Sequence, residues 1–377
     1  MKKILVNAIS IKEGGGLVVL TRLLEEMSPL QLDIQWLVVV DSSIRSKINT
    51  TKNIQLLSFQ WIKNSQAHLF YWYEIYLPAL IRRIKIDLVF SQTNFLPFKK
   101  LPCPSLLLVH QAGYFSDVFS ALQLQQTHYW YETLIWKFRC YWVNTSIKRA
   151  TRVTAQTQAL ADAIVKKTKI LSHKIAVVPH GAGLATGKIQ PKQFPMTTTI
   201  WRIGYITKYG IQKNFDVLFK ALQQLKIQGK NCKLILTLDP KHPPFHHIEA
   251  LIKEHRLDDC IENHGEIDAP AIRALYQSLD LFVFPSLCES FGFTLVEAMY
   301  YGIPVLAADT PSNREILGDA GGFFKSDQAD VLTEKIGQLM ENKDAYEKST
   351  AHNLVASKQY DWHVAAKNIL AVVNEIA

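Results

Sequence analysis

The sequence has no apolar run long enough to cross a bilayer and no cysteines arranged in pairs. Five cysteines occur among the 377 residues, and none of them forms a Cys-x-x-Cys motif. A disulfide framework and a zinc ribbon are therefore excluded, and a reducing compartment is expected. No stretch approaches the roughly 20 apolar residues of a spanning helix, and the N-terminus lacks a signal-peptide cleavage site. We expect a cytoplasmic protein.

Patterns that bind metals are also missing. The chain has 12 histidines but no His-Glu-x-x-His motif and no Cys/His cluster, and Asp-x-Asp does not occur. The sequence therefore predicts no metal and no cofactor.

Length and charge indicate two unlike halves. The 377 residues, 48% of them apolar, suit two domains of about 150–200 residues. Residues 1–190 hold 23 basic and 10 acidic residues, a net of +13, whereas residues 191–377 hold 19 and 23, a net of −4. The basic half would attract a phosphate-bearing substrate, an anionic membrane surface or nucleic acid. The alternative is a solvated basic face without a partner.

Short apolar runs alternate with helical patterns along both halves. Buried strands separated by helices predict a parallel sheet covered on both faces. We expect an α/β protein with two doubly wound, Rossmann-like domains, residues 1–185 and 186–360, which face a ligand-binding cleft. A Gly-, Pro- and Thr-rich linker joins them at 180–199. The expected strands are 2–9, 33–40, 86–91, 105–110, 152–156, 174–179, 201–206, 233–238, 279–285 and 303–308, and the expected helices are 17–27, 67–84, 128–149, 214–228, 294–301 and those from 327 onward.

The stretch LFVFPSLCESFGFTLVEAMYYGIPVLAAD (281–309) carries the strongest chemical signal. It predicts a strand, a loop with Glu289 and a helix capped by Thr294, with Gly302 just after the last helical residue. The N-terminus of such a helix favours a phosphate or diphosphate. Glu289 and Glu297 would then lie on opposite sides of that group, where a carboxylate can accept two sugar hydroxyls.

A second motif lies at an earlier strand-to-helix turn, in RIGYITKYGIQKNFDVLFKALQQL (202–225). Lys208 follows the strand, and Lys213 precedes a helix for which Asn214 is the expected N-cap. Two lysines at such a turn could neutralise the charge that develops on a departing diphosphate.

These two stretches resemble the family 4 retaining glycosyltransferases of the GT-B fold. The family's Glu-x7-Glu motif matches Glu289 and Glu297, and its Arg-x4-Lys pair matches Lys208 and Lys213, with lysine in place of arginine. The resemblance implies that the C-terminal domain binds the donor, a nucleotide-diphosphate sugar. It also implies that residues 361–377 form a helix that crosses back to the N-terminal domain. The donor-binding residues that it implies are Ser290, Phe291, Gly292, Phe293, Thr294, Leu295 and Glu297.

The N-terminal domain matches the family more loosely, through EGGG at 13–16, LLLVHQAGYF and VVPHGAG. Gly15 and Gly16 would let the backbone of the first helix approach the donor, or would form a purely structural turn. His110 follows the strand at 105–109, and the resemblance places a donor-sugar contact there. Alternatively, His110 is a structural residue at a strand end whose hydrogen bonds are satisfied within the protein.

Aromatic residues are concentrated in the basic half, in LFYWYEIYLPALIRR (69–83) and HYWYETLIWKFRCYWV (128–143). Trp and Tyr beside Lys and Arg suit a membrane interface or a lipid-linked acceptor. Packing inside the N-terminal domain would explain the same composition. No RNA-binding motif accompanies the aromatic residues, so no nucleic-acid partner is expected.

The resemblance therefore implies a metal-independent, retaining hexosyltransferase that acts with Glu289, Lys208, Lys213 and His110. Its donor would be a UDP- or GDP-sugar, and its acceptor a glycan, lipid-linked, in bacterial surface polysaccharide or O-antigen synthesis at the inner face of the cell membrane. Two alternatives stay open: a GT-B nucleotide-sugar epimerase, and a non-catalytic subunit that binds sugar or membrane.

Overall fold

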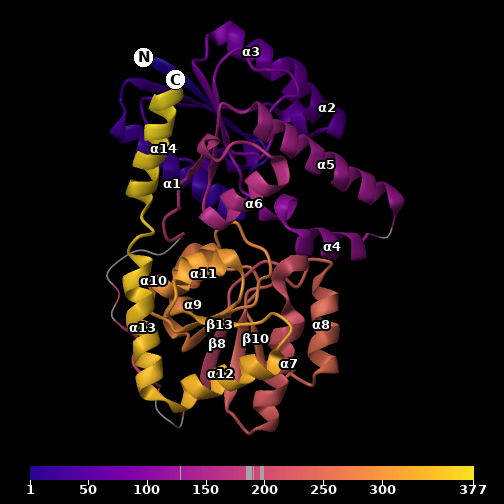
Figure 1. The fold of residues 1–377 in the computed structure, drawn as a ribbon, viewed down its shortest axis with the longest axis vertical. Helices are drawn as coiled ribbons and strands as arrows, with labels where there is room; N and C mark the ends of the chain where they lie inside the picture. The colour runs from indigo at the N-terminus through magenta and orange to yellow at the C-terminus, as the bar shows by residue number, and fades with distance from the viewer. Residues whose placement is uncertain (128, 184–188, 190, 196–198) are drawn as a thin grey trace. The chain divides into compact units, whose positions relative to one another are not determined.

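The computed structural model describes residues 1–127, 129–183, 189, 191–195 and 199–377 and divides the chain into two compact units (Figure 1). The N-terminal unit comprises residues 1–120, 124–181 and 360–377. The C-terminal unit comprises residues 121–123 and 182–359. The boundary expected at 185/186 lies outside the described residues, as do residues 184–188, 190 and 196–198 of the linker expected at 180–199.

In the described part of the N-terminal unit, seven parallel strands form one sheet in the order β3-β2-β1-β4-β5-β6-β7. The central strands are runs of Ile, Leu and Val that are buried on both faces, as expected for a sheet covered by helices. The edge strand β3 was missed because it is short and partly polar. The bounds are β1 (Lys2–Ala8), β2 (Ile34–Val40), β3 (Ile54–Leu57), β4 (Leu88–Ser91), β5 (Ser105–Leu108), β6 (Arg152–Ala155) and β7 (Ile175–Val177).

Helices of the N-terminal unit cover this sheet. The helix expected at 67–84 is interrupted by a π-helical segment, Trp72–Tyr76. The last helix belongs to this unit and packs on the first, where His363 Nδ1 lies 3.0 Å from a carboxylate oxygen of Glu26. The bounds are α1 (Gly14–Leu30), α2 (Gln66–Tyr71), α3 (Leu77–Ile84), α4 (Asp117–Gln125), α5 (Trp130–Arg149), α6 (Gln158–Thr168) and α14 (Trp362–Ile376).

The C-terminal unit has a second parallel sheet, with the order β10-β9-β8-β11-β12-β13 in the described residues. Its three-residue edge strands, β10 (Ile261–Asn263) and β13 (Gly322–Phe324), were not predicted. The other strands are β8 (Trp201–Tyr205), β9 (Cys232–Leu236), β11 (Leu281–Phe284) and β12 (Val305–Ala308). The helices are α7 (Phe215–Ile227), α8 (Phe245–Glu254), α9 (Ala269–Ser278), α10 (Phe293–Tyr300), α11 (Pro311–Leu317), α12 (Ala329–Glu341) and α13 (Lys343–Ser357).

The N-terminus of α10 corrects one predicted cap, and the N-terminus of α7 confirms the position of another. Thr294 is the second residue of α10 and does not cap it; Gly292, with φ +75°, occupies the N-cap. Asn214 is at the N-cap of α7 with φ +49°, and its side chain donates a hydrogen bond to the Ser326 carbonyl instead of capping the helix. Gly302 follows the C-cap of α10 with φ +65°, as predicted.

The aromatic clusters of the N-terminal unit divide between the core and the surface. Trp72, Tyr73 and Trp142 are buried. The exposed members, which lie on α2, on α5 or at its N-cap, are Phe70, Tyr71, Tyr129, Trp130, Tyr131, Phe138 and Tyr141. Packing inside the unit therefore accounts for part of each cluster, and a membrane role of the exposed members stays a prediction. Within the ranges that the structure describes, no helix combines the length and the apolarity that a bilayer crossing requires.

Candidate donor site in the C-terminal unit

The two charged motifs leave neighbouring strands at the same edge of the C-terminal sheet. β8 and β11 pair in parallel, so their carboxyl ends meet at one edge. The loop after β8 carries Lys208 and Lys213, and the loop after β11 carries Glu289 and leads into α10. The topology thus places the sequence-predicted charges at the edge where parallel sheets bind ligands.

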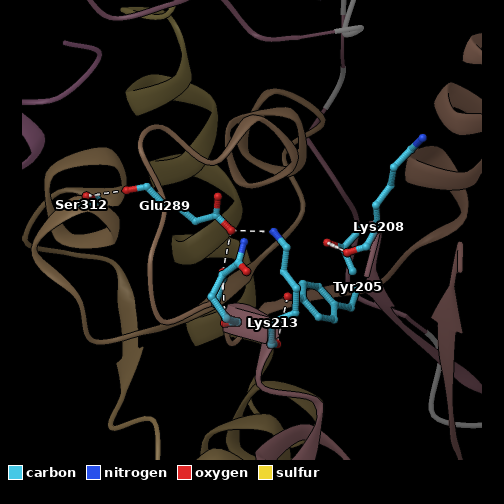
Figure 2. A network of polar contacts seen from close by, with 8 residues as sticks. Tyr205, Lys208, Lys213, Glu289 and Ser312 are labelled. Carbon is cyan, nitrogen blue, oxygen red and sulfur yellow. Dashed lines mark hydrogen bonds and ion pairs between the residues drawn. The ribbon is translucent and has the colours of Figure 1, made fainter. Parts of the chain in front are cut away.

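Lys213 and Glu289 form a close ion pair. The Lys213 Nζ lies 2.6 Å from the Glu289 Oε1, and Figure 2 shows the two charged groups pointing toward one another. The two side chains are only 14% and 17% exposed. Partial burial reduces solvent screening, so this pair interacts more strongly than an ion pair on an open surface.

Three hydroxyl groups that the sequence analysis did not single out hold this pair in place. Ser286 donates to the Glu289 Oε1 at 2.5 Å, and Ser312 donates to the Glu289 carbonyl at 3.1 Å. The Tyr205 hydroxyl donates to the Lys213 carbonyl at 3.0 Å. Burial raises the pKa of Tyr205 well above its usual value, and the nearby Glu289 charge adds to that shift. The position of Tyr205 and Ser286, at and just after the ends of β8 and β11, is a signal that could have identified them.

Lys208 is directed elsewhere. Its ammonium lies 2.7 Å from Glu266, both side chains are more than half exposed, and Figure 2 shows it extending away from Lys213. The structure therefore brings Lys213, but not Lys208, to Glu289. A lysine that is this exposed has the rotamer freedom to change partners at little cost.

Glu297 lies one turn inside α10 and is 4% exposed. The Tyr276 hydroxyl donates to its Oε2 at 2.7 Å, and a Cβ on Gly183 would lie 2.1 Å from its Oε1. Burial raises the pKa of Tyr276 well above its usual value, and the charge of Glu297 contributes. Tyr276 therefore remains a donor to Glu297, and the sequence analysis did not identify it.

The expected donor-binding segment 290–295 forms the turn into α10. Gly292 needs its left-handed backbone, and the Gly292 carbonyl accepts from the N–H groups of Leu295 and Val296. Phe291 and Leu295 are buried, and Phe291 contacts Phe293 edge to face. Their packing holds the turn in place. The backbone of Ser290 and Phe293 lies at the N-terminus of α10, where the helix dipole favours an anion.

The remaining predicted residues lie in the N-terminal unit. α1 begins at Gly14, so Gly15 and Gly16 are in its first turn, and Gly15 is exposed. His110 lies two residues beyond β5, which ends at Leu108, whereas the strand was expected to run to residue 110. Burial lowers the pKa of His110 to about 4, so its imidazole is neutral at pH 7. Among the described residues, no hydrogen-bond partner contacts its Nε2.

No three His, Cys, Asp or Glu side chains of the described ranges come together in a group that could hold a metal ion. The prediction of metal-independent chemistry stays a prediction.

Comparison with known proteins supports the sequence interpretation for both units. Residues 14–185 match the model of Glycosyltransferase Family 4, and residues 188–354 match Glycosyl transferases group 1. An O-antigen chain mannosyltransferase B of Escherichia coli is 35% identical over 158 residues, which are 42% of each chain. A phosphatidyl-myo-inositol mannosyltransferase of Mycobacterium leprae is 33% identical over 116 residues, 30% of this chain and 31% of that one. The alignments thus span less than half of these relatives.

Solved structures match over the whole chain. HepE from Anabaena, solved with UDP and glucose, gives a TM-score of 0.72 at 17% identity, and all of both chains is covered. A sucrose-phosphate synthase from Thermosynechococcus elongatus gives 0.76 at 15% identity, with 100% and 99% covered. At such identities these matches show the fold alone, and that fold is GT-B. With a family match to each of its units, the chain belongs to the family 4 glycosyltransferases.

Proposed function

We propose that this protein transfers a hexose, with retention of configuration, from a nucleoside-diphosphate sugar to a glycan acceptor. The observation that carries the proposal is the Lys213–Glu289 pair, which is 2.6 Å long, mostly buried and located beside the N-terminus of α10. A cation and a helix N-terminus at one sheet edge form a site for a diphosphate. The names of the relatives favour mannose as the sugar.

In the proposed reaction, the bond between the anomeric carbon and the diphosphate oxygen breaks, and the electron pair leaves with the nucleoside diphosphate. The acceptor oxygen forms the new bond to the anomeric carbon on the same face of the sugar. Its proton passes to the departing diphosphate. Lys213 and the α10 N-terminus stabilise the leaving group, with Lys208 able to join them, while Glu289 orients the sugar and Glu297 binds the ribose diol.

The test combines binding and turnover. A thermal-shift screen with UDP-, GDP- and ADP-sugars should show one nucleotide that raises the melting temperature, because a ligand that binds only the folded state stabilises it. Transfer or slow hydrolysis of that donor should persist in EDTA. Glu289→Ala should lower kcat by orders of magnitude, and Glu297→Ala should mainly raise KM for the donor. Unchanged kcat/KM in Glu289→Ala would contradict the assignment, and epimerised donor without transfer would favour an epimerase.

We also propose that the N-terminal unit works on a lipid-linked acceptor at the inner face of the cell membrane. Of the twenty exposed large apolar side chains among the described residues, ten lie on α2, the π-helical segment and α5 or at residue 129. The sequence around them is basic, with a net charge of +13 over residues 1–190. An exposed apolar patch of this kind marks an interaction surface, and basic residues add about 1 kcal/mol each near an anionic leaflet.

Co-sedimentation of the full chain with vesicles tests this part. Binding should rise with the fraction of anionic lipid and fall at high salt. Trp130→Ser, which removes a side chain that is 76% exposed, should weaken it. Equal binding to neutral and anionic vesicles, or no binding, would leave the basic face as a solvated surface.

A further inference from the structure

A cavity of about 590 Å³ opens between α2 and α5 in the N-terminal unit; we call it the α2–α5 pocket. Its deeper side is formed by the buried rings of Trp142 and Tyr114. Its outer walls are half-exposed side chains, Phe70 from α2 and Leu134, Ile135 and Phe138 from α5. Figure 1 shows both helices on the same side of this unit. The volume lies within the usual range for small-molecule sites.

One apolar stripe of the helix α5 runs from the core to the surface. Leu134, Phe138 and Trp142 are spaced four residues apart and therefore lie on the same side of the helix. Trp142 is buried, whereas Leu134 and Phe138 are about half exposed, and all three line the pocket. Exposed apolar side chains that line a cavity indicate an apolar occupant.

The charge of the residues that line the pocket indicates which chemical class of ligand it would bind. Arg139 is the one charged residue among the described residues that line the pocket, beside the polar Ser10 and Gln66, and no carboxylate lines it. On α5 the basic residues are Lys137, Arg139, Lys148 and Arg149, against one acid, Glu132. Arginine binds phosphate through two parallel hydrogen bonds. An apolar chain that carries a phosphate fits both features.

We propose that the α2–α5 pocket binds the first segment of the hydrocarbon chain of a phosphate-bearing lipid, with Arg139 at the phosphate. This inference rests on the proposed function, because the lipid would be the carrier of the acceptor glycan. It goes further because it assigns a defined pocket to one hydrocarbon chain. The proposed function requires only that an exposed surface attaches to a bilayer.

The experiment uses the full chain and a series of n-alkyl phosphates from butyl to dodecyl, kept below their micelle concentrations. Calorimetry or the fluorescence of Trp142 and its neighbours reports binding. Each methylene should raise the affinity about fourfold, the equivalent of about 0.8 kcal/mol, until the pocket is filled. Inorganic phosphate alone should not bind measurably. An affinity that does not depend on chain length would overturn the proposal.

Variants separate pocket binding from adsorption to a surface. Phe138→Ser and Leu134→Gln, both at half-exposed positions, should weaken decyl phosphate at least tenfold while the protein stays folded. Arg139→Gln should weaken decyl phosphate about tenfold but leave an uncharged decyl glycoside unchanged. Trp130→Ser is the matched control, because Trp130 is exposed on the same helix and does not line the pocket. A loss in Trp130→Ser equal to that in Phe138→Ser would overturn the proposal in favour of adsorption.

Two further measurements test whether a second copy of the chain occupies this face and whether the pocket and the transferase proposals fail separately. A dimer in sedimentation that Phe138→Ser dissociates and alkyl phosphates do not would assign this face to a second copy of the chain and overturn the proposal. Donor hydrolysis by the wild-type protein is measured in parallel. Chain-dependent binding without any donor turnover would support the pocket and count against the transferase assignment, whereas turnover without chain-dependent binding would overturn the pocket alone.

Discussion

Removal of the Lys213 ammonium is the most direct test of the donor site. Lys213→Met keeps a long unbranched side chain and deletes the charge that contacts Glu289. The wild-type Nζ lies 2.6 Å from the carboxylate oxygen, and both side chains are mostly buried. The substitution therefore leaves a buried carboxylate with its Ser286 hydrogen bond but without its cation.

The size of the effect follows from this geometry. Breaking a fully buried ion pair by removing one partner costs roughly 3–5 kcal/mol. The residual exposure of both groups and the remaining hydrogen bond from Ser286 reduce this cost. We therefore expect the free energy of unfolding to fall by about 2 kcal/mol. If Lys213 stabilises the leaving diphosphate, kcat should fall by about 10²–10³, the effect of removing one preorganised donor in a transition state.

The assay measures urea unfolding and steady-state transfer in the same preparations. Lys220→Met is the matched control, because Lys220 lies 2.7 Å from Asp216 in the same unit but both side chains are about half exposed. Such a helical pair contributes at most about 0.5 kcal/mol. A kcat for Lys213→Met within threefold of wild type, or an equal loss in Lys220→Met, would refute the reasoning.

Three further predictions concern His110, Tyr276 and Gly183. Burial lowers the pKa of His110 from 6.5 to about 4, so the unfolded chain binds more protons below pH 6.5, and stability is lost as the pH falls from 6.5 through 4. When the pH falls from 7 to 4.5, the free energy of unfolding measured in urea should decrease by roughly 2 kcal/mol less in His110→Gln than in wild type. The variant His246→Gln, at an exposed position, should match wild type. Tyr276→Phe should raise KM for the donor more than it lowers kcat, because Glu297 loses a buried hydrogen bond; an unchanged KM would count against this role. Gly183→Ala should lower the melting temperature and weaken donor binding, because its Cβ would meet Glu297, and a wild-type thermal shift with donor would show that no displacement occurs.

The sequence was sufficient for the strands at the centre of each sheet. β1, β2 and β11 contain the apolar runs ILV, WLVVV and LFVF, and β8 carries alternating apolar residues in WRIGY. Such patterns favour a buried parallel strand. The edge strands β3, β10 and β13 were missed because three or four residues with a partly solvated face carry little periodicity. The π-helical segment at Trp72–Tyr76 was not predicted for another reason. Its backbone hydrogen bonds span five residues in place of four, but the apolar pattern of the sequence is still that of a helix.

The site was predictable where a motif lies at a strand end and not where the contact is made at long range. Glu289 and Lys213 each follow a strand that the sequence predicted, and the structure shows that these two strands are neighbours. Tyr276 reaches Glu297 from 21 positions away on another helix, and no local pattern reports such a contact. The cap assigned to Thr294 was wrong because a left-handed Gly292 occupies the N-cap two residues earlier.

The pairing of Lys213 with Glu289 bears on how a donor would enter the site. An ammonium has three N–H donors, and among the described residues Glu289 is the one acceptor for the Lys213 Nζ. Two N–H groups are thus left for phosphate oxygens, and a donor can bind without breaking the pair. The ammonium that holds the diphosphate would then also fix the carboxylate that orients the sugar. Glu289→Gln should accordingly disturb sugar orientation and phosphate binding together, lowering kcat and raising KM. A change in kcat alone would show that Lys213 binds phosphate independently of Glu289.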